Sequence, residues 1–201
     1  MLRYHPGVAL IVVDVQNDFA DPAGSLSVRG GAAIVPIVNR EAALARNNGA
    51  LVAYSQDWHP EHTPHFAADG GTWPVHCVRE TWGAALHPAL EYPDDAPVIR
   101  KGSNGEDGYS AFTMRDQQTG RTIPTDLERL LREADVHDVV VVGLATDYCV
   151  GATAADAVRL GFATTVLTDA VAAVDLQPGD GERALASLRD AGALLHSTRM
   201  R

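Results

Sequence analysis

The sequence predicts an α/β fold, with a doubly wound, mostly parallel six-stranded sheet covered by helices on both faces. Apolar runs of strand length alternate along the chain with segments of helical periodicity, which is the pattern of βαβ units. Two of these runs, Val8–Val13 and Val139–Val142, contain no polar residue, as is typical of strands buried on both faces of a parallel sheet. With 201 residues the chain can form one sizeable core, so we expect a single domain over residues 1–201.

The first half of the chain is expected to supply three strands and one long helix. After the strand Val8–Val13 and a turn-rich stretch, apolar residues recur at helical spacing over Ala32–Asn48. An Asn-Asn-Gly sequence stops that helix. The second strand follows at Ala50–Ser55, and the third is predicted at Pro97–Arg100.

Between the second and third strands, residues 57–95 show no clear periodicity. This insert contains five of the eight histidines and all three tryptophans. A long connection without regular structure is usually functional rather than a simple linker. We therefore expect the insert at about 57–95 to carry a binding function, and its histidines indicate a metal.

The second half of the chain continues the alternation of helices and strands. Its predicted elements, in order, are a helix over Thr125–Asp135, a strand over Val139–Val142, a helix from Cys149 to Gly161, a strand over Thr164–Thr168, a helix near Gly181–Ala191 and a strand over Ala193–His196. Either Thr146 or Asp147 is the expected N-cap of the helix that contains Cys149.

Composition excludes several classes of partner. The formal net charge of −10 argues against nucleic acid or an anionic membrane as a partner, because both are negatively charged. Two cysteines are too few for a disulfide framework, so we expect a reducing compartment, the cytoplasm. The run Val8–Val13 is too short for a signal peptide, and no other segment approaches the roughly 18 apolar residues of a membrane span.

Three reactive side chains stand at or just beyond the carboxyl ends of predicted strands: Asp14, Lys101 and Cys149. In a parallel sheet those ends share one edge, so the three groups can form one constellation. A carboxylate beside a thiol can take its proton, and an ammonium beside both can hold the anions. Each residue alone has a structural alternative, since Asp can form a turn, Lys can be solvated and Cys can be a small core residue.

The position of Cys149 at the start of a helix adds to this interpretation. The first N–H groups of a helix have no partner within the helix, and the helix dipole favours negative charge there. A thiol of pKa about 8.5 is shifted toward the reactive thiolate at such a position, especially beside a cation. The same N–H groups could bind an oxyanion.

The histidine-rich insert supplies a candidate ligand set for one divalent metal ion: Asp57, His59, His65 and His76. One carboxylate and three imidazoles suit Zn, Fe or Mn. In an extended chain, the i, i+2 spacing of the first two ligands directs both side chains the same way. His62 is the main rival ligand, and Cys77 could ligate or pack. The alternative is a polar loop that merely contains histidines.

Together these motifs resemble a known family. The chain contains, in order, Asp14-Val15-Gln16-Asn17-Asp18-Phe19, Asp57-Trp58-His59 with His65-Phe66, Trp73-Pro74-Val75-His76-Cys77, Lys101-Gly102 and Gly143-Leu144-Ala145-Thr146-Asp147-Tyr148-Cys149-Val150. This set resembles the nicotinamidase/pyrazinamidase group of the isochorismatase-like cysteine hydrolases, over nearly the whole chain.

The resemblance implies an amidohydrolase that converts nicotinamide to nicotinate and ammonia through a cysteine thioester and that also acts on pyrazinamide. Cys149 would be the nucleophile, Asp14 its proton acceptor and later donor, and Lys101 the cation that polarises the site. The four ligands above would hold one divalent metal. A cis peptide would join Leu144 to Ala145, and the N–H groups of Ala145 and Cys149 would form the oxyanion hole.

The resemblance also implies that Phe19 and Trp73 flank the substrate ring, with Tyr109 as a further contact. A homo-oligomer is compatible with the family. Three other classes stay open: a related cysteine amidase acting on another small amide or carbamoyl compound, a metallohydrolase with a structural Cys149, and a non-catalytic binding protein. Metal identity and the role of the acidic stretch Ser103–Gly108 do not follow from the sequence.

Overall fold

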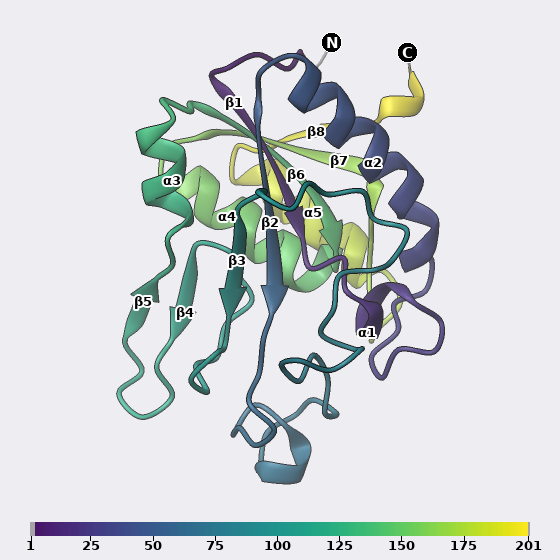
Figure 1. Ribbon diagram of the computed structural model, residues 1–201, viewed down its shortest axis with the longest axis vertical. Helices are drawn as coiled ribbons and strands as arrows, with labels where there is room; N and C mark the ends of the chain where they lie inside the picture. Colours follow the sequence, from purple (N-terminus) through teal and green to yellow (C-terminus); the bar gives the residue numbers. More distant parts are fainter. Residues whose placement is uncertain (1–2, 201) are drawn as a thin grey trace.

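Six parallel strands form the central sheet of the computed structural model, which describes residues 3–200 (Figure 1). Their order in space is β3-β2-β1-β6-β7-β8, and every neighbouring pair is parallel. The strands are β1 Val8–Val13, β2 Leu51–Asp57, β3 Val98–Lys101, β6 Asp138–Leu144, β7 Ala163–Ala172 and β8 Leu194–His196. The predicted doubly wound parallel sheet is therefore confirmed.

Helices cover both faces of this sheet (Figure 1). Helix α2, Gly31–Asn47, lies on one face, while α3 Leu127–Glu133, α4 Gly151–Arg159 and α5 Asp180–Asp190 lie on the other. Alternate residues of β1 point to opposite faces of the sheet. Leu10 and Val12 pack in the same apolar cluster as α2, and Ile11 packs in the cluster of α3, α4 and α5. This two-sided burial explains why β1 carries no polar side chain.

The connection between β2 and β3 contains one short regular element, the 3₁₀ helix η1, Ala67–Asp69. The other short elements are α1 Asn17–Ala20, the antiparallel hairpin of β4 Thr113–Arg115 and β5 Thr122–Pro124, the π-helix η2 Thr146–Val150 and the 3₁₀ helix η3 Thr198–Met200. Sequence periodicity did not predict the short α1 or the hairpin, because three or four residues are too few to show a period. Among the described residues, no helix is both long and apolar enough to cross a membrane.

The strand order reverses beside β1. The chain moves outward from β1 to β3 on one side, then crosses to β6 on the other side of β1 and moves outward again. In open α/β sheets, ligands bind outside the carboxyl ends of the strands at such a switch point. Asp14 directly follows β1, and the segment that carries Cys149 directly follows β6.

Gly143 permits the close pairing of β6 with β1 at this point. It pairs with Val13, and its φ of +113° lies in the region that favours glycine. A Cβ atom there would overlap the backbone of Val13, including its carbonyl oxygen. Only glycine therefore fits where β6 approaches the end of β1.

We predict that Gly143→Ala lowers the free energy of unfolding by at least about 2 kcal/mol more than Gly192→Ala, as measured by urea unfolding. Gly192 has a similar φ of +107°, but a Cβ there would meet nothing within 4 Å. Gly192→Ala therefore has the conformational cost of a positive φ without the steric overlap that Gly143→Ala would make with Val13. Equal losses of stability in the two variants would show that the contact with Val13 is unimportant.

Candidate active site

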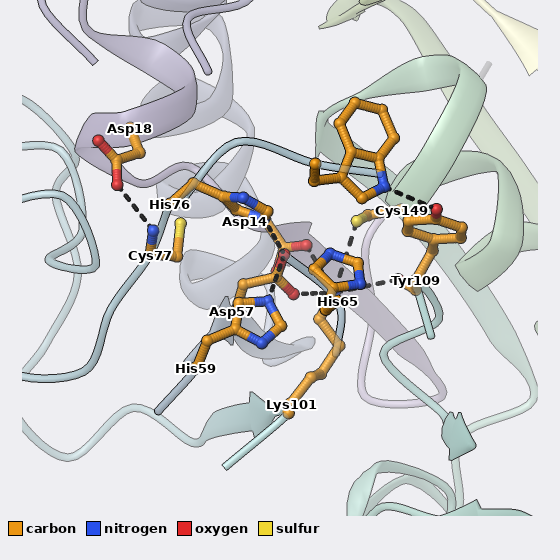
Figure 2. Close-up of polar contacts among 12 residues, drawn as sticks. Asp14, Asp18, Asp57, His59, His65, His76, Cys77, Lys101, Tyr109 and Cys149 are labelled. Atoms are coloured by element: carbon orange, nitrogen blue, oxygen red, sulfur yellow. Dashed lines mark hydrogen bonds and ion pairs between the residues drawn. The ribbon is translucent and has the colours of Figure 1, made fainter. Parts of the chain in front are cut away.

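The carboxyl edge of the sheet brings together the three residues expected from the strand ends (Figure 2). Lys101 Nζ donates a hydrogen bond to Asp14 Oδ2 at 2.7 Å and lies 3.5 Å from Cys149 Sγ. All three side chains are buried. Ser55 Oγ donates to the other oxygen of Asp14 at 2.6 Å, so both carboxylate oxygens are held.

Lys101 also contacts the first predicted metal ligand. Its Nζ lies 2.8 Å from Asp57 Oδ1 and donates to the carbonyl oxygen of Tyr109 at 3.0 Å. Burial would lower the pKa of Lys101, but the Asp14 and Asp57 carboxylates raise it well above its usual value. One ammonium ion therefore compensates two buried carboxylates.

The environments of these two carboxylates differ. Burial raises the pKa of Asp14 from its usual value, against the opposing effect of Lys101. Burial acts on Asp57 too, but Lys101 and His59 together hold its pKa well below its usual range. Two neighbouring acids with different pKa values can take different chemical roles, one in proton transfer and the other as a permanent charge. Asp14 can accept and return a proton, while Asp57 stays ionised and could act as a metal ligand.

The Cys149 thiol lies in the same buried group. One oxygen of Asp14, one oxygen of Asp57 and Cys149 Sγ lie within 4.8 Å of one another. Burial raises the pKa of the thiol well above its usual value, against the opposing effect of Lys101, and the Asp14 and Asp57 carboxylates raise it further. The sequence-based expectation of a lowered pKa at a helix start is therefore wrong for this thiol. The thiol keeps its proton until a base takes it, and Asp14 is the adjacent base.

The helix start itself differs from the expected one. Cys149 lies in η2, a π-helix that runs directly into α4, and the residue at the N-cap position is Ala145, with no side-chain cap. Neither Thr146 nor Asp147 is the N-cap. The Asp147 carboxylate instead accepts hydrogen bonds from the N–H groups of Val174 at 2.9 Å and Asp175 at 2.8 Å. Those partners lie in the segment after β7, so local sequence gave no sign of them. The Leu144–Ala145 peptide is cis, as expected.

The four expected metal ligands converge beside Lys101. Ligand atoms of His59, His65 and His76 lie within 4.8 Å of one another, and all three residues are buried. Asp57 Oδ2 lies 3.8 Å from His59 Nε2 and 3.9 Å from His76 Nε2. The insert therefore places its three imidazoles over the carboxylate at the end of β2.

Their hydrogen bonds fit a metal site. Both ring nitrogens of His59 are buried and have no hydrogen-bond partner among the described residues, which is rare for buried polar atoms unless a ligand binds them. His76 Nδ1 donates to the carbonyl oxygen of Pro74 at 2.7 Å, and His65 Nδ1 lies 2.9 Å from Asp107 Oδ1. Both rings thus have Nε2 available. One ionised aspartate and three imidazoles fit a divalent ion.

The two rival ligands lie outside this cluster. His62 is exposed, and its Nδ1 lies 3.3 Å from Asp69 Oδ1. Cys77 is buried; its backbone N–H donates to Asp18 Oδ2 at 2.7 Å, and its sulfur contacts the carbonyl oxygen of Gly83 at 4.0 Å. Burial raises the pKa of the Cys77 thiol well above its usual value, which suits a packing role.

A pocket opens between the thiol and the histidines. Phe19, Trp73 and Tyr109, the expected substrate contacts, all line it, together with Cys149 and Ala145. Trp73 Nε1 donates to the hydroxyl of Tyr109 at 3.0 Å, which joins two of the aromatic walls. The pocket is therefore a narrow, largely apolar slot with the sulfur on its wall.

Several lining residues were not predicted: Leu26, Val28, Tyr148 and Val174. The Tyr148 ring packs edge-on against Trp73, with 4.9 Å between the ring centroids. Its place next to Cys149 was a signal that could have been used. The other three lie on loops that only the tertiary fold brings to the pocket.

Gln16 is a further residue that sequence reasoning missed. Its side chain is fully buried and pairs with the backbone of Asp57 in both directions: Nε2 donates to the carbonyl oxygen at 2.7 Å, and Oε1 accepts from the N–H at 2.8 Å. This amide clamp fixes the end of β2 to the segment that follows β1. It explains why a glutamine stands two residues after Asp14.

The chain is similar to known proteins over nearly its whole length. Residues 8–200 match the family model described as the Isochorismatase domain. The nicotinamidase of Escherichia coli (strain K12) is 38% identical over 96% of this chain and 95% of its own length. The structure of the pyrazinamidase of Pyrococcus horikoshii in complex with zinc gives a TM-score of 0.85 at 40% identity, covering 96% of this chain and 99% of that chain. PnC1 from L. infantum in complex with nicotinate gives 0.88 at 37% identity, covering 98% and 96%.

We predict a specific pH dependence for the stability of the metal-free protein. Burial lowers the pKa of His76 from 6.5 to about 4, so between those values the unfolded chain binds a proton that the folded chain does not. Stability is therefore lost as pH falls through this window. Between about pH 7.5 and about pH 5, the free energy of unfolding of the wild type should fall by about 2 kcal/mol more than that of His76→Asn, as measured by urea unfolding with a chelator present. A difference in unfolding free energy between the wild type and His76→Asn that does not change with pH would contradict this prediction.

Proposed function

The chain belongs to the isochorismatase family, and on that premise we propose that it is a nicotinamidase, which hydrolyses nicotinamide to nicotinate and ammonia. One observation carries the proposal: the Lys101 ammonium joins the Asp14 carboxylate and the Cys149 sulfur on one side to a metal ligand, Asp57, on the other. A nucleophile and a binding site for a ring nitrogen thus face the same slot. The nicotinamidase and pyrazinamidase relatives support this substrate class.

In the proposed first half-reaction, Cys149 Sγ attacks the carboxamide carbon and its proton passes to Asp14. The tetrahedral intermediate then collapses, the C–N bond breaks, and Asp14 delivers the proton to the departing nitrogen, which leaves as ammonia. The raised pKa of Asp14 suits both steps, because the group must accept a proton and give it back. The product of this half is a thioester on Cys149.

In the second half-reaction, Asp14 takes a proton from a water molecule, which attacks the thioester carbon. The C–S bond breaks as Asp14 returns that proton to the sulfur, and the product leaves as nicotinic acid, which loses its proton to solvent water to give nicotinate. Lys101 keeps the charge of the site balanced while the proton moves, since it contacts both Asp14 and the sulfur. We propose the N–H groups of Ala145 and Cys149 as the oxyanion hole, where loss of one donor typically costs about 3–4 kcal/mol.

We propose that one divalent ion, Zn, Fe or Mn, is held by Asp57, His59, His65 and His76. When bound, it would coordinate the pyridine nitrogen of the substrate and so orient the ring for attack. The buried, unbonded nitrogens of His59 and the zinc complex of the Pyrococcus horikoshii pyrazinamidase support this assignment. The insert at about 57–95 would then be the metal-binding part of a single domain over residues 1–201.

The walls of the slot select the substrate. Phe19, Trp73 and Tyr109 line it and would flank a flat ring, and pyrazinamide, which has a ring of the same size, should fit as well. Nicotinate is the product, so the reaction would belong to NAD salvage in the cytoplasm.

The first test is ammonia release from nicotinamide, compared with other small amides, by the wild type and by Cys149→Ala. We expect the substitution to abolish turnover, because it removes the nucleophile, and to leave the bound metal unchanged in elemental analysis. Cys77→Ala is the matched control, since Cys77 is the other buried free thiol. It should keep activity within a few-fold of wild type. Undiminished ammonia release by Cys149→Ala would refute the thioester mechanism.

A second test removes one metal ligand. We expect His59→Ala to lose bound metal and to weaken substrate binding, because the ring nitrogen loses its anchor. His62→Ala, on the same insert but exposed and outside the cluster, should keep both. Each substitution is made in the Cys149→Ala background, so that substrate binds without turning over. Elemental analysis then measures the bound metal, and titration with nicotinamide measures substrate binding. Full metal content in His59→Ala would show that the cluster is not the binding site.

A further inference from the structure

The acidic loop between β3 and β4, residues 102–108, contacts the histidine cluster through one residue. Asp107 Oδ1 lies 2.9 Å from Nδ1 of the buried His65. An ionised carboxylate only accepts hydrogen bonds, so Nδ1 of His65 is the donor. The proton of the ring is then on Nδ1, and the lone pair that a metal needs is on Nε2.

The Asp107 carboxylate is itself fixed in place. Its Oδ1 also accepts from the N–H of Gly108 at 2.8 Å, and its Oδ2 lies 3.3 Å from Nη2 of Arg115. Two backbone hydrogen bonds, of 2.8 and 2.6 Å, join Asp107 to Arg115 on β4. The side chain is only 25% exposed. A carboxylate held by so many contacts can hold a histidine ring in one orientation.

The three histidines of the cluster differ in what faces Nδ1. His76 donates to a backbone carbonyl, and His59 Nδ1 has no hydrogen-bond partner among residues 3–200. Within that part of the chain, His65 is the member of the cluster whose Nδ1 faces a carboxylate. A carboxylate on the far side of a ligating imidazole fixes its tautomer and raises its basicity toward the metal.

We propose that Asp107 is a positioning residue of the metal site, whose carboxylate holds His65 in the Nδ1–H tautomer with Nε2 directed at the ion. This inference rests on the metal site of the proposed function and adds a residue outside its ligand set. It also gives the acidic loop a role: the loop supplies the carboxylate behind His65.

Zinc affinity without substrate tests the proposal. Metal-free wild type and Asp107→Asn are titrated with Zn²⁺ against a chromophoric chelator. We expect Asp107→Asn to bind Zn²⁺ about 10–100-fold more weakly. Glu106→Gln is the matched control: it makes the same chemical change one residue earlier, where the carboxylate accepts hydrogen bonds from Asn104 instead of a histidine. Its Zn²⁺ affinity should stay within about twofold of wild type.

Two further measurements separate positioning from a general structural effect. In a His65→Ala background, Asp107→Asn should weaken Zn²⁺ binding no further, because the ring it orients is gone. In the wild type loaded with Zn²⁺, nitrogen-15 NMR of the histidine rings should show His65 protonated on Nδ1. The NMR measurement needs no variant, so it holds even if Asp107→Asn folds poorly.

Three results would overturn the proposal: unchanged Zn²⁺ affinity in Asp107→Asn, an equal loss in Glu106→Gln, or a His65 ring protonated on Nε2. None of these measurements uses nicotinamide. A protein that binds Zn²⁺ as expected but releases no ammonia would therefore refute the proposed function alone. An active nicotinamidase with unchanged Zn²⁺ affinity in Asp107→Asn would refute only the role of Asp107.

Discussion

The site depends on one ion cluster, in which the Lys101 ammonium lies between the carboxylates of Asp14 and Asp57. All three groups are almost completely buried, and a lone charge at that depth would be strongly destabilising. The sheet builds the cluster directly: β1, β2 and β3 are neighbours, and Asp57 and Lys101 are register partners in the β2–β3 pair. Parallel pairing alone therefore brings an ammonium beside the two acids.

The same cation gives the two carboxylates different chemistry. Asp57 has Lys101 on one oxygen and histidine nitrogens near the other, so it stays ionised and suits a metal. Asp14 has Lys101 and a serine hydroxyl, and burial still raises its pKa, so it suits proton transfer. The raised pKa of Cys149 leaves its thiol protonated, so in the proposed mechanism the sulfur becomes nucleophilic when Asp14 takes its proton.

Sequence reasoning predicted the strands, their parallel pairing and the residues at their ends, because strands buried in a parallel sheet consist of unbroken apolar runs. It placed Asp14, Lys101 and Cys149 at one edge, and the structure brings them together. It missed what depends on distant contacts. The pKa of Cys149 follows from burial between carboxylates of two other strands, and Asp107 meets His65 across 42 positions of sequence. No local period or spacing reports such pairs.

The path of the insert explains how an irregular segment can hold a precise site. It leaves the sheet at Asp57, the last residue of β2, and rejoins it at Val98, the first residue of β3. Lys101, at the end of β3, pairs with Asp57 through backbone register and through their side chains. The N–H of Trp58, the residue after Asp57, also donates to the carbonyl oxygen of Lys101 at 2.8 Å. The start of the insert is thus fixed at the cation that contacts the sulfur. Attack requires reacting atoms within about 3–3.5 Å, and this anchor lets the rigid sheet set the distance between the histidine cluster and the thiol.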